Sequence, residues 1–169
     1  MKTLYLLRHA KSSWDEPGLP DFDRPLNKRG EKAAPLMGKV MRERKVRPDV
    51  VLCSPAKRTK QTAKLALKAA KSDLDVVFDE RLYLASENQL RKVLSELDDL
   101  VEAVLLVGHN PDLEDLLEYL TGDCEGMVTG TLASLTLNIK HWSDSLEGNG
   151  KLDWLVKPKD LMESPAEHN

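Results

Sequence analysis

Two histidines and two arginines stand directly after short apolar runs of the sequence or within a few residues of them: Arg8, His9, Arg58 and His109. Arginine forms bidentate hydrogen bonds to phosphate oxygens, and histidine can be a nucleophile that carries a covalent intermediate. Phosphoryl transfer depends mainly on positioning and on neutralising the charge of the transferred group. Two arginines and a protonated histidine could provide both without a metal. The set therefore predicts chemistry on a phosphate, although each residue alone is more often structural or exposed.

The elements that must position these residues are short strands and longer helices. The apolar runs are rich in Val and Leu and are typical of buried strands, at residues 3–7, 49–53, 75–78 and 103–107. Segments with apolar residues at helical spacing follow each of them. Cap residues and a capping box indicate where the later helices start. We expect helices at about 28–45, 54–71, 86–98 and 112–120.

The alternation of strands and helices predicts an α/β fold, a three-layer sandwich whose mostly parallel central sheet has helices on both faces. Two later apolar runs, 132–139 and 151–156, flank a polar loop and predict a C-terminal antiparallel hairpin. Residues 12–25 are rich in Pro, Asp and Gly and predict an irregular loop. Ligands of such sheets bind beyond the carboxyl ends of the strands. We therefore expect the histidines and arginines to meet in one crevice, near helix N-termini that favour anions.

The composition fits a single globular domain with an uneven distribution of charge. The 169 residues are 41% hydrophobic and 31% charged, and no run approaches the roughly 18 apolar residues of a membrane span. Residues 1–75 hold 18 Lys+Arg and 9 Asp+Glu, a net charge of +9, whereas residues 76–169 hold 7 and 19, a net charge of −12. A basic half could bind nucleic acid or attract an anionic substrate. Because only 5% of residues are aromatic and none interleave with basic ones, we expect no nucleic-acid partner and no membrane partner.

The N-terminal segment and the cysteines indicate the compartment. The first apolar run is interrupted by Arg8 and Lys11, and no small-residue cleavage site follows, so we read no signal peptide. Cys53 and Cys124 are too few for a disulfide scaffold. We expect a protein of the reducing cytoplasm.

Ordered motifs resemble those of a known family. The segments LYLLRHAKS, RPLNKRG, SPAKRTKQTA and LLVGHNP occur in the order found in the histidine phosphatase superfamily, also called phosphoglycerate mutase-like. RHAKSSW, GHNPDLEDL and WLVKPKDL are similar to the SixA-type phosphohistidine phosphatase branch. The resemblance covers about residues 3–160, which implies a histidine phosphatase domain at 1–160 and a polar tail at 161–169.

The resemblance implies a metal-independent phosphatase without a cofactor. It identifies His9 as the nucleophile that is phosphorylated, and places Arg8, Arg58 and His109 in the phosphate pocket. In the mutase branch a Glu after the third strand protonates the leaving oxygen, and the segment DERLYLAS puts Glu80 there. Competing carboxylates occur in the first loop: Asp15, Asp21 and Asp23.

Several alternatives stay open at this stage. The substrate, and hence the partner, could be a protein phosphohistidine or a small phosphorylated molecule. A noncatalytic phosphate-binding or phosphoprotein-binding module could keep the same pocket. A phosphoglycerate mutase-like phosphotransferase could use the same histidine. Residues 78–86 leave little room for a lid, which favours hydrolysis. A cysteine phosphatase is disfavoured because Cys53 and Arg58 lack the required spacing, and a zinc site at His9, His109 and Cys53 lacks paired-ligand spacing.

Overall fold

The computed structural model describes residues 1–162. The part of the expected polar tail from residue 163 onward, including His168, lies outside the described residues, and the domain boundaries stay a prediction. The elements follow the chain in this order: β1 (Lys2–Arg8), η1 (Asp21–Asp23), α1 (Lys28–Glu43), β2 (Val50–Cys53), α2 (Lys57–Ala69), β3 (Val76–Phe78), η2 (Glu80–Leu82), α3 (Glu87–Ser95), β4 (Ala103–Gly108), α4 (Asp112–Thr121), β5 (Leu132–Leu137), β6 (Gly150–Val156) and α5 (Pro158–Met162).

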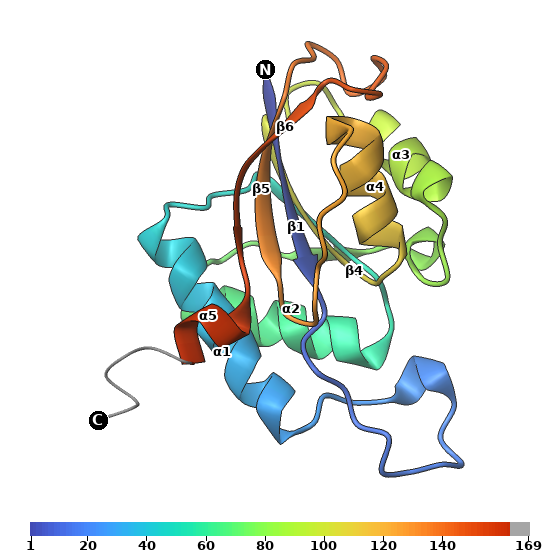
Figure 1. The fold of residues 1–169 in the computed structure, drawn as a ribbon, viewed down its shortest axis with the longest axis vertical. Helices are drawn as coiled ribbons and strands as arrows, with labels where there is room; N and C mark the ends of the chain where they lie inside the picture. The colour runs from blue at the N-terminus through green and yellow to red at the C-terminus, as the bar shows by residue number, and fades with distance from the viewer. Residues whose placement is uncertain (163–169) are drawn as a thin grey trace.

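The six strands form one mixed sheet (Figure 1) in the order β3-β2-β4-β1-β5-β6. Strand β1 pairs in parallel with β4, β4 with β2, and β2 with β3. Strand β5 runs antiparallel to β1, and β6 runs antiparallel to β5. The predicted α/β fold, with a mostly parallel sheet and a C-terminal antiparallel hairpin, is therefore confirmed. The carboxyl ends of the four parallel strands meet at one edge of the sheet.

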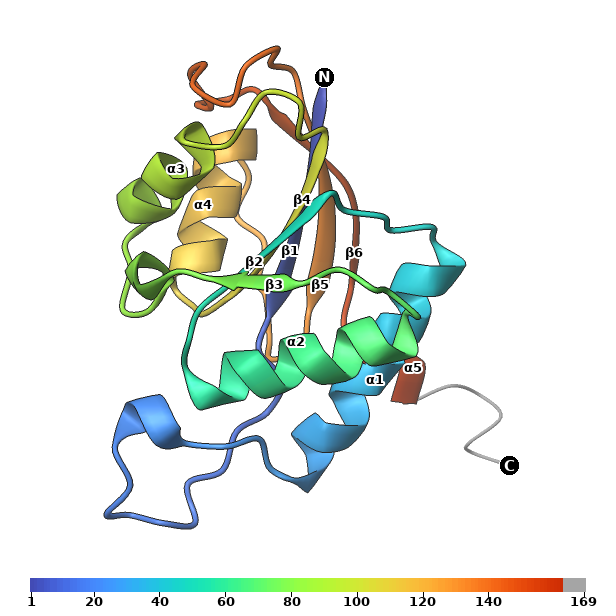
Figure 2. The same ribbon diagram turned by 180° about the vertical axis from the view of Figure 1, so that it is seen from behind.

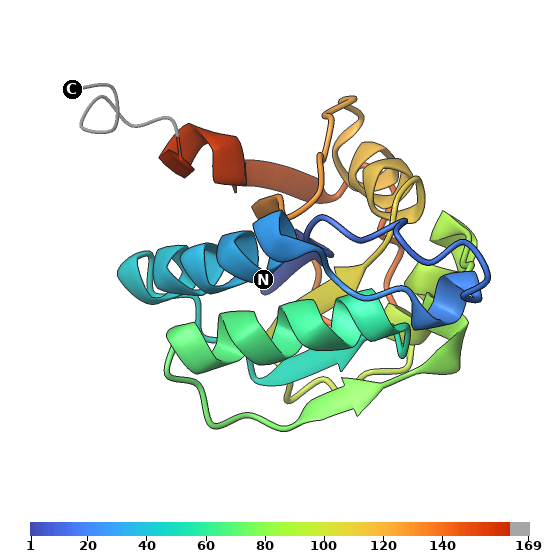
Figure 3. The ribbon, with the colours of Figure 1, turned by 90° about the horizontal axis from the view of Figure 1, so that it is seen from below.

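Helices cover both faces of the sheet, as predicted. Figure 3 shows α1 and α2 on one face and α3 and α4 on the other. Alternate residues of β1 point to opposite faces, so Leu4 and Leu6 belong to the core cluster with α3 and α4, whereas Leu7 packs with α1 and α2. All three are fully buried. The buried leucine side chains hold the strand that ends at Arg8 rigidly between the two helical layers.

Two glycines allow close backbone contacts that fix the layer of α1 and α2. A Cβ atom at Gly38 of α1 would collide with the carbonyl oxygen of Ala66 in α2. A Cβ atom at Gly30 would collide with the carbonyl oxygen of Lys11, in the segment that follows β1. Helix α1 therefore supports both α2 and the chain just beyond β1, the two parts that carry Arg58 and His9.

The third predicted strand differs from the expectation, because it is not buried. Strand β3 lies at the edge of the sheet and pairs only with β2 (Figure 2). Val77 and Phe78 are 51% and 48% exposed. A run of apolar residues shows that a strand forms, but it does not show whether a further strand or helix covers it.

One helix boundary and one additional helix also differ from the expectation. Helix α2 starts at Lys57, three residues after Ser54, where the sequence predicts its start. The Ser54 hydroxyl contacts the His109 ring and also accepts the backbone N–H of Ala56. Helix α5 was not predicted. The capping box at Ser86 is as expected, and α4 ends at Gly122, a glycine in the left-handed conformation. None of the helices within residues 1–162 is long and apolar enough to cross a membrane.

Candidate functional site

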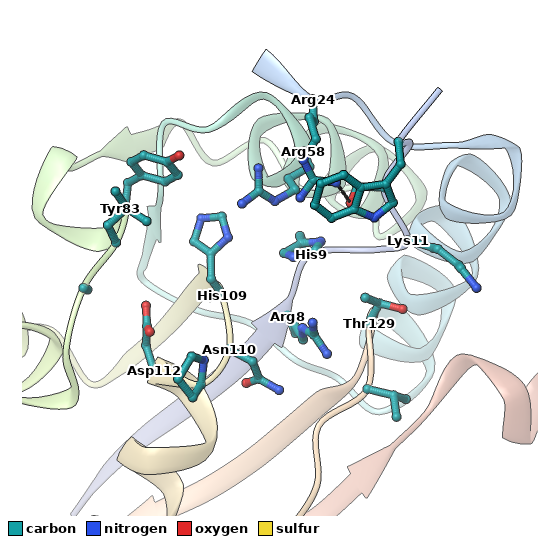
Figure 4. Close-up of a pocket in the computed structure, with 16 residues that line it drawn as sticks. Arg8, His9, Lys11, Arg24, Arg58, Tyr83, His109, Asn110, Asp112 and Thr129 are labelled. Carbon is teal, nitrogen blue, oxygen red and sulfur yellow. Dashed lines mark hydrogen bonds between the residues drawn. The ribbon is translucent and has the colours of Figure 1, made fainter. Parts of the chain in front are cut away.

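A cavity of about 750 Å³ opens at the carboxyl ends of β1, β2 and β4. The four residues singled out in the sequence, Arg8, His9, Arg58 and His109, all line it (Figure 4). They come from the end of β1, the first turn of α2 and the segment after β4, and are far apart in the sequence. The parallel topology brings them together, as expected for ligand sites of such sheets.

His9 has a defined tautomer. Its Nδ1 atom lies 2.7 Å from the carbonyl oxygen of Ala10, and a carbonyl oxygen can only accept a hydrogen bond. Nδ1 therefore carries the proton, and Nε2 keeps its lone pair. The pKa of His9 is lowered to about 4, mainly by burial and in part by the positive charges of Arg58 and Arg8, which together outweigh the opposite effect of the hydrogen bond to Ala10. The ring is neutral near pH 7, which suits a nucleophile.

Arg58 is buried and is oriented by the loop after β1. Its two terminal nitrogens donate to the carbonyl oxygen of Asp21 at 2.7 Å and to Asp21 Oδ2 at 3.1 Å. The same carboxylate accepts the Tyr83 hydroxyl at 2.6 Å and Arg24 Nε at 3.1 Å. The Tyr83 hydrogen bond is the largest influence on the pKa of Asp21, which is lowered to about 2 with help from Arg58. Asp21 is thus an ionised anchor that ties the first loop to the cavity wall.

His109 faces His9 across the cavity, with a distance of 5.3 Å between ring centroids. Its Nε2 lies 2.8 Å from the Ser54 hydroxyl. Burial lowers its pKa to about 3, and the charge of Arg58 adds to this effect. The sequence-based picture of a protonated histidine beside two arginines is therefore wrong for the free protein, because burial among cations keeps both rings neutral. The positive charge of the cavity comes instead from its arginine and lysine side chains.

The cavity contains most of the unpartnered buried polar atoms of the described chain. Within residues 1–162, six buried side-chain nitrogen or oxygen atoms have no hydrogen-bond partner, and five belong to residues that line the cavity. They are Arg8 Nε, Arg58 Nε, His109 Nδ1, Asn110 Oδ1 and Asp112 Oδ2. Unpartnered buried polar groups are rare and costly in folded proteins. Their concentration in one cavity indicates a site built for a polar ligand.

The candidate proton donors do not line this cavity. Glu80 is exposed on η2 and is absent from the cavity lining. Asp15 and Asp23 are also outside the lining, and Asp21 is occupied by its three donors. The acidic residue in the lining is Asp112, whose pKa burial raises to about 6. Figure 4 shows it on the far side of His109 from His9.

Cys53, weighed above as a nucleophile and zinc ligand, and His141, to which the sequence assigns no role, both lie outside the cavity lining. Cys53 is fully buried within β2, and burial raises the pKa of its thiol to about 12, so a thiolate nucleophile is disfavoured. His141 is exposed and pairs with Asp99 outside the cavity. Within residues 1–162, no three His, Cys, Asp or Glu side chains are grouped so that they could hold a metal ion.

Several lining or supporting residues carried no assignment from the sequence. Arg24 is buried and lines the cavity, with its guanidinium carbon 3.5 Å from the Trp14 ring centroid. Tyr83 also lines the cavity and, like Arg24, donates to the Asp21 carboxylate. Ser54 was interpreted only as a helix cap. The sequence offered little signal for them, because each reaches the site through a loop whose path only the tertiary structure shows.

Comparisons with known proteins agree with this geometry. A family model for the histidine phosphatase superfamily (branch 1) matches residues 4–83. The chain is 32% identical to a protein of Agrobacterium tumefaciens whose crystal structure bears the provisional name phosphohistidine phosphatase SixA, and the match covers 93% of this chain and 98% of that one with a TM-score of 0.81. A structure of the protein histidine phosphatase SixA complexed with tungstate is 27% identical over 94% of this chain and 99% of that one, with a TM-score of 0.80.

A sequence relative extends the comparison. An uncharacterized protein of Mycobacterium tuberculosis is 35% identical over 80% of this chain and 79% of its own length. The solved structures match nearly the whole chain, and the strand order positions the ordered RH, SPAKR and GHNP segments at one cavity. The chain belongs to the histidine phosphatase superfamily, in its SixA-type branch.

Proposed function

We propose that the protein is a phosphatase that hydrolyses protein phosphohistidine, or a phosphomonoester, through a phospho-His9 intermediate. The observation that carries this proposal is the tautomer of His9. Its proton is held by the Ala10 carbonyl, which leaves Nε2 as a neutral nucleophile in a cavity lined by Arg8 and Arg58. Such a nucleophile, oriented by a hydrogen bond to its other nitrogen, fits the usual requirements for covalent catalysis.

The proposed reaction has two displacements at phosphorus. In the first, His9 Nε2 forms a bond to phosphorus while the bond from phosphorus to the leaving oxygen or nitrogen breaks, and the leaving group gains a proton. In the second, water attacks phospho-His9, the phosphorus–nitrogen bond breaks, and phosphate leaves as Nε2 is restored. Arg8 and Arg58 would neutralise the charge of the three equatorial oxygens, and His109 would orient them through a hydrogen bond.

The source of the leaving-group proton bears on the substrate. Glu80, the donor implied by the resemblance, is not brought to the cavity. An imidazole leaving group can take its proton from solvent beforehand, because it titrates near pH 6.5, whereas an alkoxide depends on a positioned acid. This difference favours a phosphohistidine over an alkyl phosphate as the substrate.

The mouth of the cavity also favours a protein substrate. Trp14 and Leu84 line the cavity and are 74% and 79% exposed. Exposed apolar side chains around a phosphate pocket can contact the chain that carries the phosphate.

The proposed setting is the reducing cytoplasm, which suits the unpaired thiols of Cys53 and Cys124. The alternatives are a noncatalytic phosphate-binding module and a mutase-like phosphotransferase.

Turnover should require no metal, and vanadate should inhibit it. Vanadate adopts the five-coordinate geometry of the transferring phosphorus, and catalytic sites bind such geometry more tightly than substrate. The test measures hydrolysis of a phosphohistidine protein, a phosphotyrosine peptide and a sugar phosphate, each with EDTA and with vanadate. We expect phosphate release that resists EDTA and is blocked by vanadate, highest for the phosphohistidine protein.

Each alternative has its own outcome in the same experiment. Binding without phosphate release would assign a noncatalytic module. Transfer of the phosphate to a second acceptor rather than to water would assign a phosphotransferase. Activity that EDTA abolishes and added zinc restores would replace the metal-independent mechanism with a metal-dependent one.

A further inference from the structure

A second cavity, of about 140 Å³, adjoins the main one and shares Lys11, Val128 and Thr129 with it. Three cationic side chains line it: Lys11 from the segment after β1, Arg29 from the first turn of α1 and Lys159 from α5. None of its lining residues is acidic. We refer to these three cationic residues and the space between them as the basic groove.

Close backbone contacts fix two walls of the basic groove. Lys11 rests on Gly30 of α1, where a Cβ atom would collide with the Lys11 carbonyl oxygen. The start of α5, Pro158, rests on Gly130, which has a φ of +81° and no room for a Cβ atom. These contacts hold three separate elements together at one point. The cations are therefore brought near one another by the fold and not by chance loop positions.

The three cations are not neutralised within the described chain. None of the ion pairs among residues 1–162 includes Lys11, Arg29 or Lys159. The acidic neighbours on the same helices, Glu31 and Asp160, do not line the basic groove. Like charges held together destabilise the free protein, and an anion bound between them would relieve the repulsion.

We propose that the basic groove binds acidic side chains that flank the phosphorylated residue of a protein substrate. This inference rests on the proposed phosphatase function, because it extends the same site. The basic groove adjoins the phosphate cavity and shares Lys11, Val128 and Thr129 with it, so one polypeptide can contact both. Its charge is complementary to carboxylates, and the exposed Trp14 and Leu84 at the mouth of the main cavity suit contact with a polypeptide.

Two phosphohistidine peptides of equal length test this, one with glutamates on both sides of the phosphohistidine and one with glutamines. We expect kcat/KM to be roughly 5- to 30-fold higher for the acidic peptide, because its two glutamates can pair with the exposed cations of the basic groove. The preference should shrink in high salt, which screens exposed charges. In the double variant Arg29→Glu, Lys159→Glu, the preference should disappear.

The matched control is Lys39→Glu, Lys64→Glu, which makes the same change in net charge at two exposed positions that line neither cavity. It should keep the preference. Equal kcat/KM for the two peptides with the wild-type protein would overturn the inference, as would a preference that survives Arg29→Glu, Lys159→Glu. The inference would also be overturned if the double variant Arg29→Glu, Lys159→Glu lowered kcat/KM for a small bisphosphate more than it lowered kcat/KM for the acidic peptide. Failure to hydrolyse either peptide or 4-nitrophenyl phosphate would instead reject the proposed function itself.

An independent observation concerns Ser54, which is fully buried just after β2. Its hydroxyl oxygen lies 2.8 Å from His109 Nε2 and also accepts the backbone N–H of Ala56 at 3.4 Å. The other ring nitrogen of His109, Nδ1, is buried without a partner. A neutral imidazole has one proton to share between these two nitrogens.

We infer that Ser54 is a positioning residue that sets the tautomer of His109. Among residues 1–162, His109 Nε2 is the one acceptor within hydrogen-bond distance of the buried Ser54 hydroxyl, so the hydroxyl satisfies its own proton by donating it there. That arrangement keeps the ring proton on Nδ1, where it can be donated to a phosphate oxygen. Loss of the hydroxyl would allow the proton to move to Nε2 and would turn Nδ1 into an acceptor facing an anion.

The test combines nitrogen-15 NMR of the imidazole rings with kinetics. We expect His109 of the wild-type protein to carry its proton on Nδ1. In Ser54→Ala the proton should shift towards Nε2, and kcat/KM of this variant should fall about 10- to 100-fold because one donor to the phosphate is lost. Ser54→Thr, which keeps a hydroxyl, should restore the tautomer. The control Thr131→Val removes another fully buried hydroxyl, one without a hydrogen-bond partner, and should leave the His109 tautomer unchanged. A wild-type His109 with protonated Nε2, or an unchanged tautomer in Ser54→Ala, would overturn the inference.

Discussion

Replacing His9 with alanine should abolish the covalent intermediate and lower kcat by on the order of 10⁴-fold or more, as removal of a catalytic nucleophile does in other enzymes. The reason is the geometry of the ring. The carbonyl oxygen of Ala10 accepts its Nδ1 proton, and burial keeps its pKa near 4. Among residues 1–162, the other histidine that lines the cavity is His109. His109 Nε2 is already occupied by Ser54.

Rapid quenching in base measures this directly, because a phosphorus–nitrogen bond survives base and is labile in acid. With a phosphorus-32 substrate, label should appear on the peptide that contains His9 and vanish on acid treatment. His9→Ala should show no label, whereas His141→Ala, at an exposed histidine outside the cavity, should be labelled normally. Label on His109 or Cys53, or steady turnover by His9→Ala, would contradict the mechanism.

Arg58→Lys should lower kcat/KM by on the order of 10- to 1000-fold, as the loss of one charge-stabilising donor does. Lysine keeps the charge but loses the planar fork. The two terminal nitrogens of Arg58 bind Asp21, and among residues 1–162 its buried Nε has no hydrogen-bond partner. A single ammonium group cannot hold Asp21 and a phosphate oxygen in the same geometry.

The measurement compares kcat/KM and vanadate inhibition of Arg58→Lys with those of Arg81→Lys. Arg81 also pairs with two carboxylates, Asp79 and Glu96, but lies outside the cavity. Circular dichroism and thermal melting show whether each variant is folded. Wild-type efficiency in a folded Arg58→Lys would remove Arg58 from phosphate binding, and an equal loss in Arg81→Lys would point to a general effect of arginine replacement.

Local patterns in the sequence determined most of the architecture. Short Val- and Leu-rich runs, cap residues and the capping box at Ser86 are effects of neighbouring residues, so they indicate where strands and helices form. The regular alternation of these elements then leaves few topologies. For the same reason the sequence pointed to Arg8, His9, Arg58 and His109, since each lies near the carboxyl end of a predicted parallel strand.

Only the tertiary structure decided which groups surround those four residues and in which state they are held. The pKa values of His9 and His109 are lowered mainly by burial, which depends on packing from distant elements. Asp21 is an anchor for Arg58 because the first loop folds back onto α2, and Glu80 misses the cavity because of the path taken by η2. Spacing along a chain specifies local geometry, whereas desolvation, ion pairing and the meeting of loops depend on contacts between residues far apart in the sequence.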